Sequence, residues 1–450
     1  MTPDGVVEAD LALADGRVAG LSSGDSATHA GEVRDVRGLL ILPGLIDSHA
    51  HLREPGHEHK EDILHGTRAA AAGGYTTVMG MPNVSPPTTT VERYREAIAR
   101  YERSAIVDFN HHPVPTSLDE IPALADAGAL GFKAYLISDA GRDYLREPGL
   151  SFGDHGHLFE AMLAVAGTGR PLLVHPHDPG LMRAIEAPYL QRGERDFRAY
   201  ARAFASYEGI VWDTAAALVA RLQEATDVRL HLLHIKTKRM IEIVRRAKAA
   251  GRDVTSEINP VSLLLANEWE NIERVGPYAL STWTGEGQTD ALWEALRDGT
   301  IDVIGTDHAP HSRAEKEIGW TDMWKASGGL PHLQETLPLF LTEVAAGRLR
   351  VERLVEVASA APARLFGLWP RKGALLPGSD ADLVVVAPTA EDEIREEDVL
   401  SKCGWTAWNG RHVVGRTVLT MVRGRIVYEN GVVTGEPGWG RLATVAPQPD

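Results

Sequence analysis

Short apolar runs recur along the middle of the chain, and most are followed by a segment with the spacing of an amphipathic helix. Eight of these runs have the length of a buried strand: residues 39–47, 75–80, 105–110, 130–135, 171–175, 229–234, 253–258 and 301–306. The helical spacing is illustrated by 58–72 and 238–250, where charged positions surround recurring apolar ones. Eight strand-then-helix units predict a closed parallel (β/α)8 barrel, an α/β fold.

Both ends of the chain have the alternation of β-strands instead. Residues 7–21 alternate around Asp15-Gly16, and residues 381–386 and 417–428 are further strand candidates with a turn near Arg423-Gly424. These pieces are predicted to form one small β unit. The tail after Gly438 is expected to be a loosely held surface segment.

Composition restricts the possible partners. The chain has 450 residues, whereas a barrel alone takes about 250, so one barrel and a smaller unit fit. Neither a secretory signal nor an apolar run long enough for a membrane span is present, and we expect a cytoplasmic protein without membrane contact. A single cysteine, Cys403, excludes an intrachain disulfide. The net charge of −16 argues against binding nucleic acid.

Polar residues gather where the predicted barrel strands end. His49 and His51 stand one residue apart at the end of the first strand, so both point to the same side. Such a pair on its own is more often two polar residues at a strand exit. Later strand ends add four more candidates: Lys133, His175, His234 and Asp307. All six meet at one mouth only if the barrel closes, and imidazole and carboxylate there predict a metal site.

Two neighbouring histidines need separate interpretation. His231 lies three residues before His234 in the same strand, and this odd spacing predicts that it faces the outer helices as a structural residue. His177 follows His175 at even spacing, so both can face the mouth, and the role of His177 stays open.

Seven stretches carry a resemblance to a known family: 43–56 (PGLIDSHAHLREPG), 60–83, 131–136 (GFKAYL), 171–175, 233–237, 299–311 and 377–386. In order and spacing they resemble the amidohydrolase superfamily, and within it the cyclic amidohydrolases, with dihydroorotase most similar. The resemblance implies a barrel flanked by a β-sandwich built from both chain ends. We therefore expect the sandwich at 1–42 and 369–450, the latter with the tail, and the hydrolase barrel at 43–368.

The same resemblance implies a dinuclear metal centre. His49 and His51 would hold one divalent cation and His175 and His234 the other. Lys133 would bridge them as a carbamate formed with carbon dioxide, while Asp307 would bind the first cation and shuttle protons. Zinc is the default, although Mn, Co or Fe can substitute. The implied reaction is hydrolysis of a ring amide by activated water.

A dihydroorotase-like substrate is implied by the residues that match Arg53, Asn83 and His311, which hold a substrate carboxylate in dihydroorotases. Hydantoinases usually lack that arginine, so an acidic cyclic ureide is the leading substrate. The alternative for Arg53 is an ordinary salt bridge to one of three nearby glutamates, Glu54, Glu58 or Glu61.

Departures from the dihydroorotase pattern keep other readings open. Residues 259–265 lack a histidine pair, residues 276–293 replace a proline-rich segment, and His332 stands where the family usually has glycine and can narrow the pocket. An allantoinase- or hydantoinase-like enzyme is the alternative. An inactive scaffold homologue is a further one, although such relatives lose several ligands and this chain keeps all six.

Two more expectations come from the resemblance alone. Family members begin with a strand ahead of the segment that resembles residues 2–21, so the natural start is expected upstream of Met1. A homodimer or homotetramer is the expected assembly.

Overall fold

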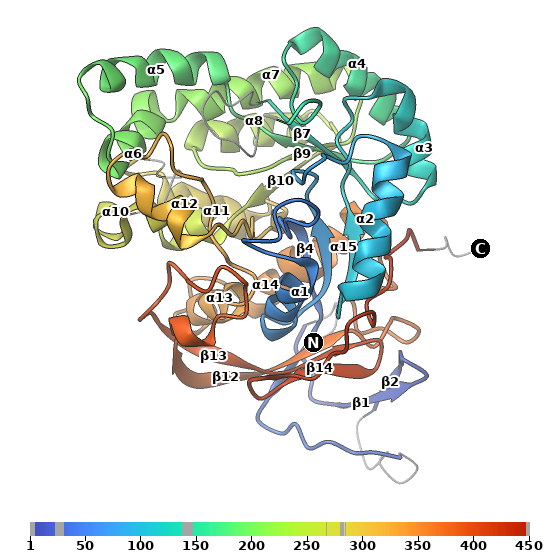
Figure 1. The fold of residues 1–450 in the computed structure, drawn as a ribbon. Coiled ribbons are helices and arrows are strands. Elements are labelled where there is room, and N and C mark those ends of the chain that lie inside the picture. The colour runs from blue at the N-terminus through green and yellow to red at the C-terminus, as the bar shows by residue number, and fades with distance from the viewer. Residues whose placement is uncertain are drawn as a thin grey trace.

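The computed structural model describes residues 5–22, 31–136, 147–266, 268–279, 283 and 285–446. In this part of the chain eight parallel strands form two arcs, one ordered β4-β5-β6 and the other β7-β8-β9-β10-β11 (Figure 1). Their bounds are β4 (Leu45–Ala50), β5 (Tyr75–Gly80), β6 (Asp108–His111), β7 (Phe132–Tyr135), β8 (Leu172–His175), β9 (Leu230–Leu232), β10 (Val254–Ile258) and β11 (Val303–Ile304).

Backbone hydrogen bonds join the two arcs. Between β6 and β7, the amide of Lys133 donates to the carbonyl of Pro113 (2.9 Å). On the other side the amide of His51 donates to the carbonyl of His308 (2.7 Å), which links the end of β4 to the segment after β11. The predicted (β/α)8 barrel is therefore confirmed.

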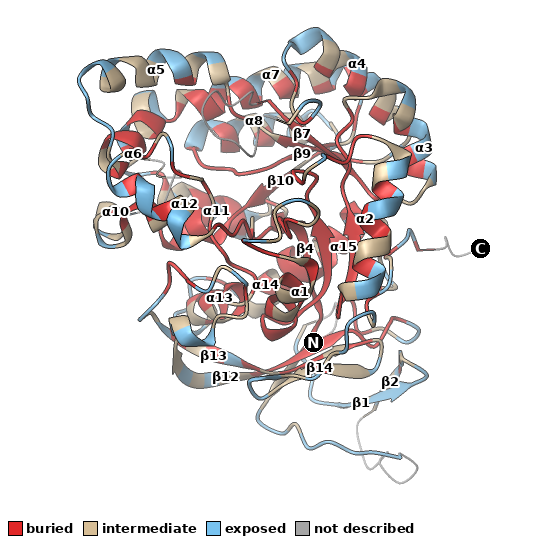
Figure 2. Cartoon of the chain, viewed as in Figure 1, coloured by how far each residue is buried: buried red, intermediate tan, exposed pale blue. Residues whose placement is uncertain are grey.

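Helices surround and cap the barrel. Those in the described ranges are α1 (Ile63–Ala72), α2 (Val91–Ser104), α3 (Ile121–Asp126), α4 (His155–Ala166), α5 (Pro179–Gln191), α6 (Phe197–Ala205), α7 (Ile210–Thr226), α8 (Lys238–Ala249), α9 (Pro260–Leu264), α10 (Trp269–Val275), α11 (Thr289–Asp298), α12 (Arg313–Glu317), α13 (Thr336–Ala345), α14 (Val351–Val355) and α15 (Ala361–Leu365). Figure 2 shows buried strands inside and exposed outer helix faces. Among the described residues, no helix is long and apolar enough to cross a membrane.

The amphipathic helix predicted over residues 238–250 is found as α8, with most large apolar positions buried and most charged positions exposed. Met240, Ile241 and Val244 are buried against the barrel, while the charged positions between them face outward. Thr237 caps the helix by accepting a hydrogen bond from the amide of Met240 (3.1 Å). Local sequence thus sets both the start of α8 and the face that it buries.

Both chain ends contribute to one antiparallel sheet, which lies below the barrel in Figure 1. Its strands are β3 (Leu40–Pro43), β12 (Leu383–Glu393), β13 (His412–Val422), β14 (Arg425–Glu429) and β15 (Val432–Val433), and β1 (Asp10–Ala14) pairs with β2 (Arg17–Ser22) in a separate hairpin. β3 lies directly against β12. The predicted β-sandwich built from both termini is confirmed.

The first apolar run, predicted as one strand over residues 39–47, is two strands. β3 ends at Pro43 in the sandwich sheet, and β4 begins at Leu45 in the barrel. Gly44 separates them, and a Cβ at this position would collide with the side chain of Thr76. Continuous hydrophobicity hides the change because both strands are buried.

The prediction of a loosely held tail after Gly438 is wrong for residues 438–446. The amide of Phe109 in β6 donates to the carbonyl of Arg441 (3.0 Å), and the amide of Ala443 donates back to Phe109 (2.7 Å). Ala443 is buried. The segment pairs with the backbone at the edge of β6, a contact between distant parts of the sequence.

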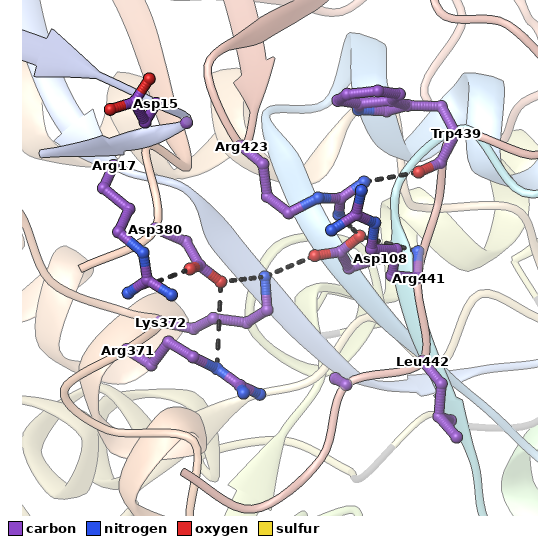
Figure 3. A pocket seen from close by; sticks show the side chains of 12 residues that line it. Asp15, Arg17, Asp108, Arg371, Lys372, Asp380, Arg423, Trp439, Arg441 and Leu442 are labelled. Carbon is purple, nitrogen blue, oxygen red and sulfur yellow. Dashed lines mark hydrogen bonds and ion pairs between the residues drawn. The ribbon is translucent and has the colours of Figure 1, made fainter. Parts of the chain in front are cut away.

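A buried ion cluster joins the sandwich to the lower end of the barrel. Lys372 Nζ lies 2.6 Å from carboxylate oxygens of both Asp108 and Asp382 and 3.3 Å from Asp380. Figure 3 shows its contacts with Asp108 and Asp380. These three aspartates have the spacing of a cation site, but the lysine ammonium stands among them. They line or adjoin a cavity of about 440 Å³ that arginines also border.

Lys372→Met is expected to lower the free energy of unfolding by about 3–5 kcal/mol, because the buried carboxylate of Asp382 loses its cation. Chemical denaturation measures this change. Arg17→Met is the control, since the Arg17 side chain is 56% exposed and lies 4.0 Å from Asp380; its loss should stay below about 1 kcal/mol. Equal losses in the two variants would contradict a dominant role for Lys372.

Candidate active site

Three of the predicted metal ligands meet directly at the upper end of the barrel. Nε2 of His49 and Nε2 of His51 lie 3.3 Å and 3.2 Å from the same oxygen of Asp307. The two histidines come from the end of β4 and the aspartate from the loop after β11. A closed barrel thus brings together residues that are more than 250 positions apart in the sequence.

The remaining candidates surround this group. Lys133 Nζ lies 3.4 Å from His49 Nε2. The ring centre of His234 lies 5.0 Å from that of His49 and 4.6 Å from that of His175. We call His49, His51, Lys133, His175, His234 and Asp307 the donor cluster.

Each of three imidazoles is held by a polar side chain on the ring nitrogen Nδ1. His49 Nδ1 lies 2.7 Å from a carboxylate oxygen of Glu257, and His51 Nδ1 lies 2.5 Å from the carboxamide oxygen of Asn83. His234 Nδ1 lies 2.7 Å from the carboxamide oxygen of Asn259. Such acceptors fix the tautomer and orientation of metal-binding histidines and leave Nε2 free to bind.

Glu257 and Asn259 were not singled out by sequence reasoning. Both lie at the end of β10, and Glu257 is fully buried. The available signal was a carboxylate near the end of the predicted buried strand 253–258, since a buried acid requires a partner. That partner, His49, is distant in sequence.

The backbone is strained at three positions of the site. Arg53, His234 and Asp307 have φ of 60°, 57° and 52°, in the left-handed region that non-glycine residues rarely adopt. Residues in this region cluster at functional sites, where surrounding contacts hold them. At His234 the turn follows directly after β9, so strand alternation no longer decides where its side chain points.

For this reason the prediction that His231 faces the outer helices is wrong. His231 is fully buried, and its Nε2 lies 3.8 Å from a carboxylate oxygen of Glu257. Glu257 reaches across to His49 in β4, so both it and His231 lie inside the barrel. His231 retains the predicted structural role, but supports the donor cluster from beneath.

Burial sets the protonation of the donor cluster. Desolvation lowers the pKa of His51 and of His234 to about 3, so both imidazoles are neutral near pH 7 and have a lone pair for a metal. Burial also lowers the pKa of Lys133 to about 7. Although burial acts in the opposite direction, the neighbouring His49 holds the pKa of Asp307 well below its ordinary value.

These residues fit a dinuclear cation site. Neutral imidazoles and carboxylates are the donors that zinc and its neighbours accept. Two overlapping groups, His49–His51–Asp307 and His49–His234–Glu257, have donor atoms within 4.8 Å of one another. In addition, Nε2 of His175 is buried without a hydrogen-bond partner in the described part of the chain.

The three predicted substrate-binding residues lie beside the donor cluster, and two of them, Arg53 and His311, contact each other. Arg53 is buried, with Nε donating to the carbonyl of Pro310 (3.2 Å) and Nη2 3.1 Å from His311 Nε2. On its other nitrogen His311 lies 3.3 Å from Lys60 Nζ.

His177 and His332 occupy different surroundings. The ring of His177 stacks on Trp212 at 5.2 Å and 18°, so it forms part of an aromatic wall beside His175. His332 is buried and accepts a hydrogen bond from the indole of Trp408 (3.2 Å), while its amide donates to His308 (3.0 Å).

Comparison with known proteins identifies the family. The sequence matches the Amidohydrolase family over residues 212–427 and the Dihydro-orotase-like family over residues 38–179. It is 34% identical to L-hydantoinase of Paenarthrobacter aurescens over 99% of this chain and 96% of that protein. The chain belongs to the cyclic amidohydrolases of the amidohydrolase superfamily.

Relatives of this cyclic amidohydrolase have different names at nearly the same identity. Dihydroorotase of Thermus aquaticus is 35% identical over 93% of this chain and 95% of that protein. Allantoinase of Rubrobacter xylanophilus is 36% identical over 96% and 93%. The solved structure of L-hydantoinase from Arthrobacter aurescens superimposes with a TM-score of 0.91 at 34% identity, covering 98% of this chain and 97% of that one. The sequence motifs favoured dihydroorotase, whereas overall identity does not distinguish it from hydantoinase and allantoinase.

Glu257→Gln is expected to weaken metal binding about 10- to 100-fold, because a neutral amide orients His49 less strongly than a carboxylate. Competition between the protein and a chelator, followed by metal analysis, measures this effect. Glu242→Gln, which changes an exposed acid on α8, is the matched control. Unchanged metal affinity in the Glu257 variant would remove its role in positioning His49.

Proposed function

We propose that this cyclic amidohydrolase is a dinuclear metal hydrolase that opens a cyclic ureide with an acidic substituent, as dihydroorotase does. The observation that carries the proposal is the buried guanidinium of Arg53 beside His51 and the donor cluster, with His311 3.1 Å from its Nη2. A guanidinium suits a carboxylate because it offers two parallel donors.

The donor cluster divides naturally between two cations. His49, His51 and Asp307 would hold one, His175 and His234 the other, and Lys133 would bridge them once its amine has added carbon dioxide and lost a proton. When bound, divalent cations lower the pKa of water and polarise a carbonyl. Zinc is the default metal for this donor set. Neutral imidazoles favour metal binding, and a lysine pKa of about 7 favours the reaction of its amine with carbon dioxide.

Asp307 is suited to move the proton. Its carboxylate touches His49 and His51, yet 23% of its side chain is exposed to the mouth. It would take a proton from the attacking water and return it to the ring nitrogen that leaves. General acid–base transfer of this kind needs a carboxylate within hydrogen-bond reach of both positions.

A hydantoinase-like substrate is the second candidate. It is supported by the L-hydantoinase relative, which matches 99% of this chain, and by the contacts that Arg53 already makes to Pro310 and His311. Those contacts leave fewer guanidinium donors for a substrate carboxylate. The expected assembly, a homodimer or homotetramer, stays a prediction.

Carbamylation of Lys133 predicts a mass increase equal to carbon dioxide when the protein is loaded with metal in bicarbonate. Mass spectrometry under non-denaturing conditions measures it. In Lys133→Arg the increase should disappear, together with most of the second equivalent of metal. An unmodified lysine in a fully active, metal-loaded enzyme would contradict the bridging role.

Arg53→Gln tests the acidic substrate. For dihydroorotate we expect kcat/KM to fall about 10- to 100-fold, because a charged hydrogen bond is lost, whereas dihydrouracil should change little. Steady-state hydrolysis of dihydroorotate, dihydrouracil, hydantoin and allantoin measures both. Arg239→Gln, an arginine whose side chain is 65% exposed, is the control. Turnover of hydantoin without turnover of dihydroorotate would transfer the assignment to the second candidate.

A further inference from the structure

Lys236 is a buried lysine at the active site that the proposed chemistry does not use. It stands in the connection between β9 and α8, at the same end of the barrel as the donor cluster. The residue is only 1% exposed. Within the described parts of the chain, its ammonium makes no hydrogen bond or ion pair.

Lys236 has an aromatic neighbour, and the carboxylate of Asp307 acts on its charge from beyond ion-pair distance. Its Nζ lies 4.4 Å from the centre of the Trp212 ring. Trp212 in turn lies 5.5 Å from the ring of His175 and 6.3 Å from that of His234, so the lysine stands over a wall of the active site. The ring face stabilises the cation, but it satisfies none of the three N–H donors with an oxygen.

The loop that carries Lys236 is fixed in place. The hydroxyl of Thr237, the next residue, donates to Asp213 on α7 and also caps α8. The amide of Asp178 donates to the carbonyl of Val211 (3.0 Å), which fastens the start of α7 to the end of β8. The cation and its aromatic support are therefore held in position before a ligand arrives, which reduces the entropic cost of binding.

Lys236 and Arg53 approach the donor cluster from different strands. Arg53 follows β4, whereas Lys236 follows β9, and the imidazoles of His49 and His234 lie between those strand ends. Among the described residues no carboxylate forms an ion pair with Lys236, although Asp307 acts on its charge from farther away, so an anionic ligand would supply the direct partner that a buried ammonium needs.

We propose that Lys236 binds an anionic substituent of the substrate, so that the enzyme prefers a cyclic ureide with a carboxylate on the ring or on a short arm that reaches the Trp212 wall. This inference rests on the proposed function, because it names the side of the ring on which the acid is recognised. It makes Lys236 a residue that determines specificity.

The test compares charged and neutral rings of matched size. The pairs are dihydroorotate with dihydrouracil, and hydantoin-5-acetate with hydantoin-5-acetamide. For Lys236→Met we expect the ratio of kcat/KM, charged over neutral, to fall about 10- to 100-fold for at least one pair, mainly through KM. Lys236→Arg should keep most of the preference. Lys238→Met removes an exposed lysine two residues away and should leave the ratio unchanged.

A purely structural role gives a different result. If Lys236→Met lowers turnover of charged and neutral rings equally, or leaves the ratio unchanged in both pairs, the inference is overturned. If Arg53→Gln loses the preference for charged rings but Lys236→Met keeps it, the inference about Lys236 is also overturned, whereas the proposed function stands.

Binding without turnover separates the two proposals. Calorimetry with the ring-opened acids N-carbamoylaspartate and N-carbamoyl-β-alanine measures recognition of the extra carboxylate even if none of the rings is hydrolysed. Absence of hydrolysis by the metal-loaded protein would refute the proposed function. Weaker binding of N-carbamoylaspartate alone in Lys236→Met would still support the inference, and equal binding of both acids by the native protein would overturn it.

Discussion

Closure of the parallel sheet is the constraint on which the active site depends. The hydrogen bond from the amide of His51 to the carbonyl of His308 joins the end of the first barrel strand to the segment after the last. This contact brings Asp307 against His49 and His51. Without closure the donors would remain at separate strand ends, and none of these positions binds a metal firmly by itself.

The barrel interior also supplies the groups that orient the donors. Glu257, Asn83 and Asn259 each contact the Nδ1 nitrogen of one histidine, and two of them come from β10. Burial keeps the imidazoles of His51 and His234 neutral by making a charged ring costly. The same burial brings the pKa of Lys133 to about 7, so the environment that shapes the ligands also makes the lysine amine available for reaction.

Basic side chains of two kinds are buried in the barrel, and their partners distinguish them. Lys372, at the opposite end of the barrel, lies among three aspartates and connects the two domains. Arg53 is held by Pro310 and His311, whereas Lys236 is supported by the face of Trp212. In a chain of net charge −16, these three basic side chains are buried inside the protein and do not belong to its surface.

The sequence by itself determined the eight strand-then-helix units, the β-rich ends and the strand-end positions of the donor cluster, because periodicity and order along the chain are local properties. It missed the break at Gly44, the pairing of residues 441–443 with β6 and the inward position of His231. Each of these depends on a contact between distant segments or on one left-handed residue. The partners of the histidines likewise became visible only in the folded chain, since Glu257 has meaning only beside His49. Only the tertiary structure decided these histidine contacts, because packing, and not strand alternation, sets the direction of a side chain after a strand end.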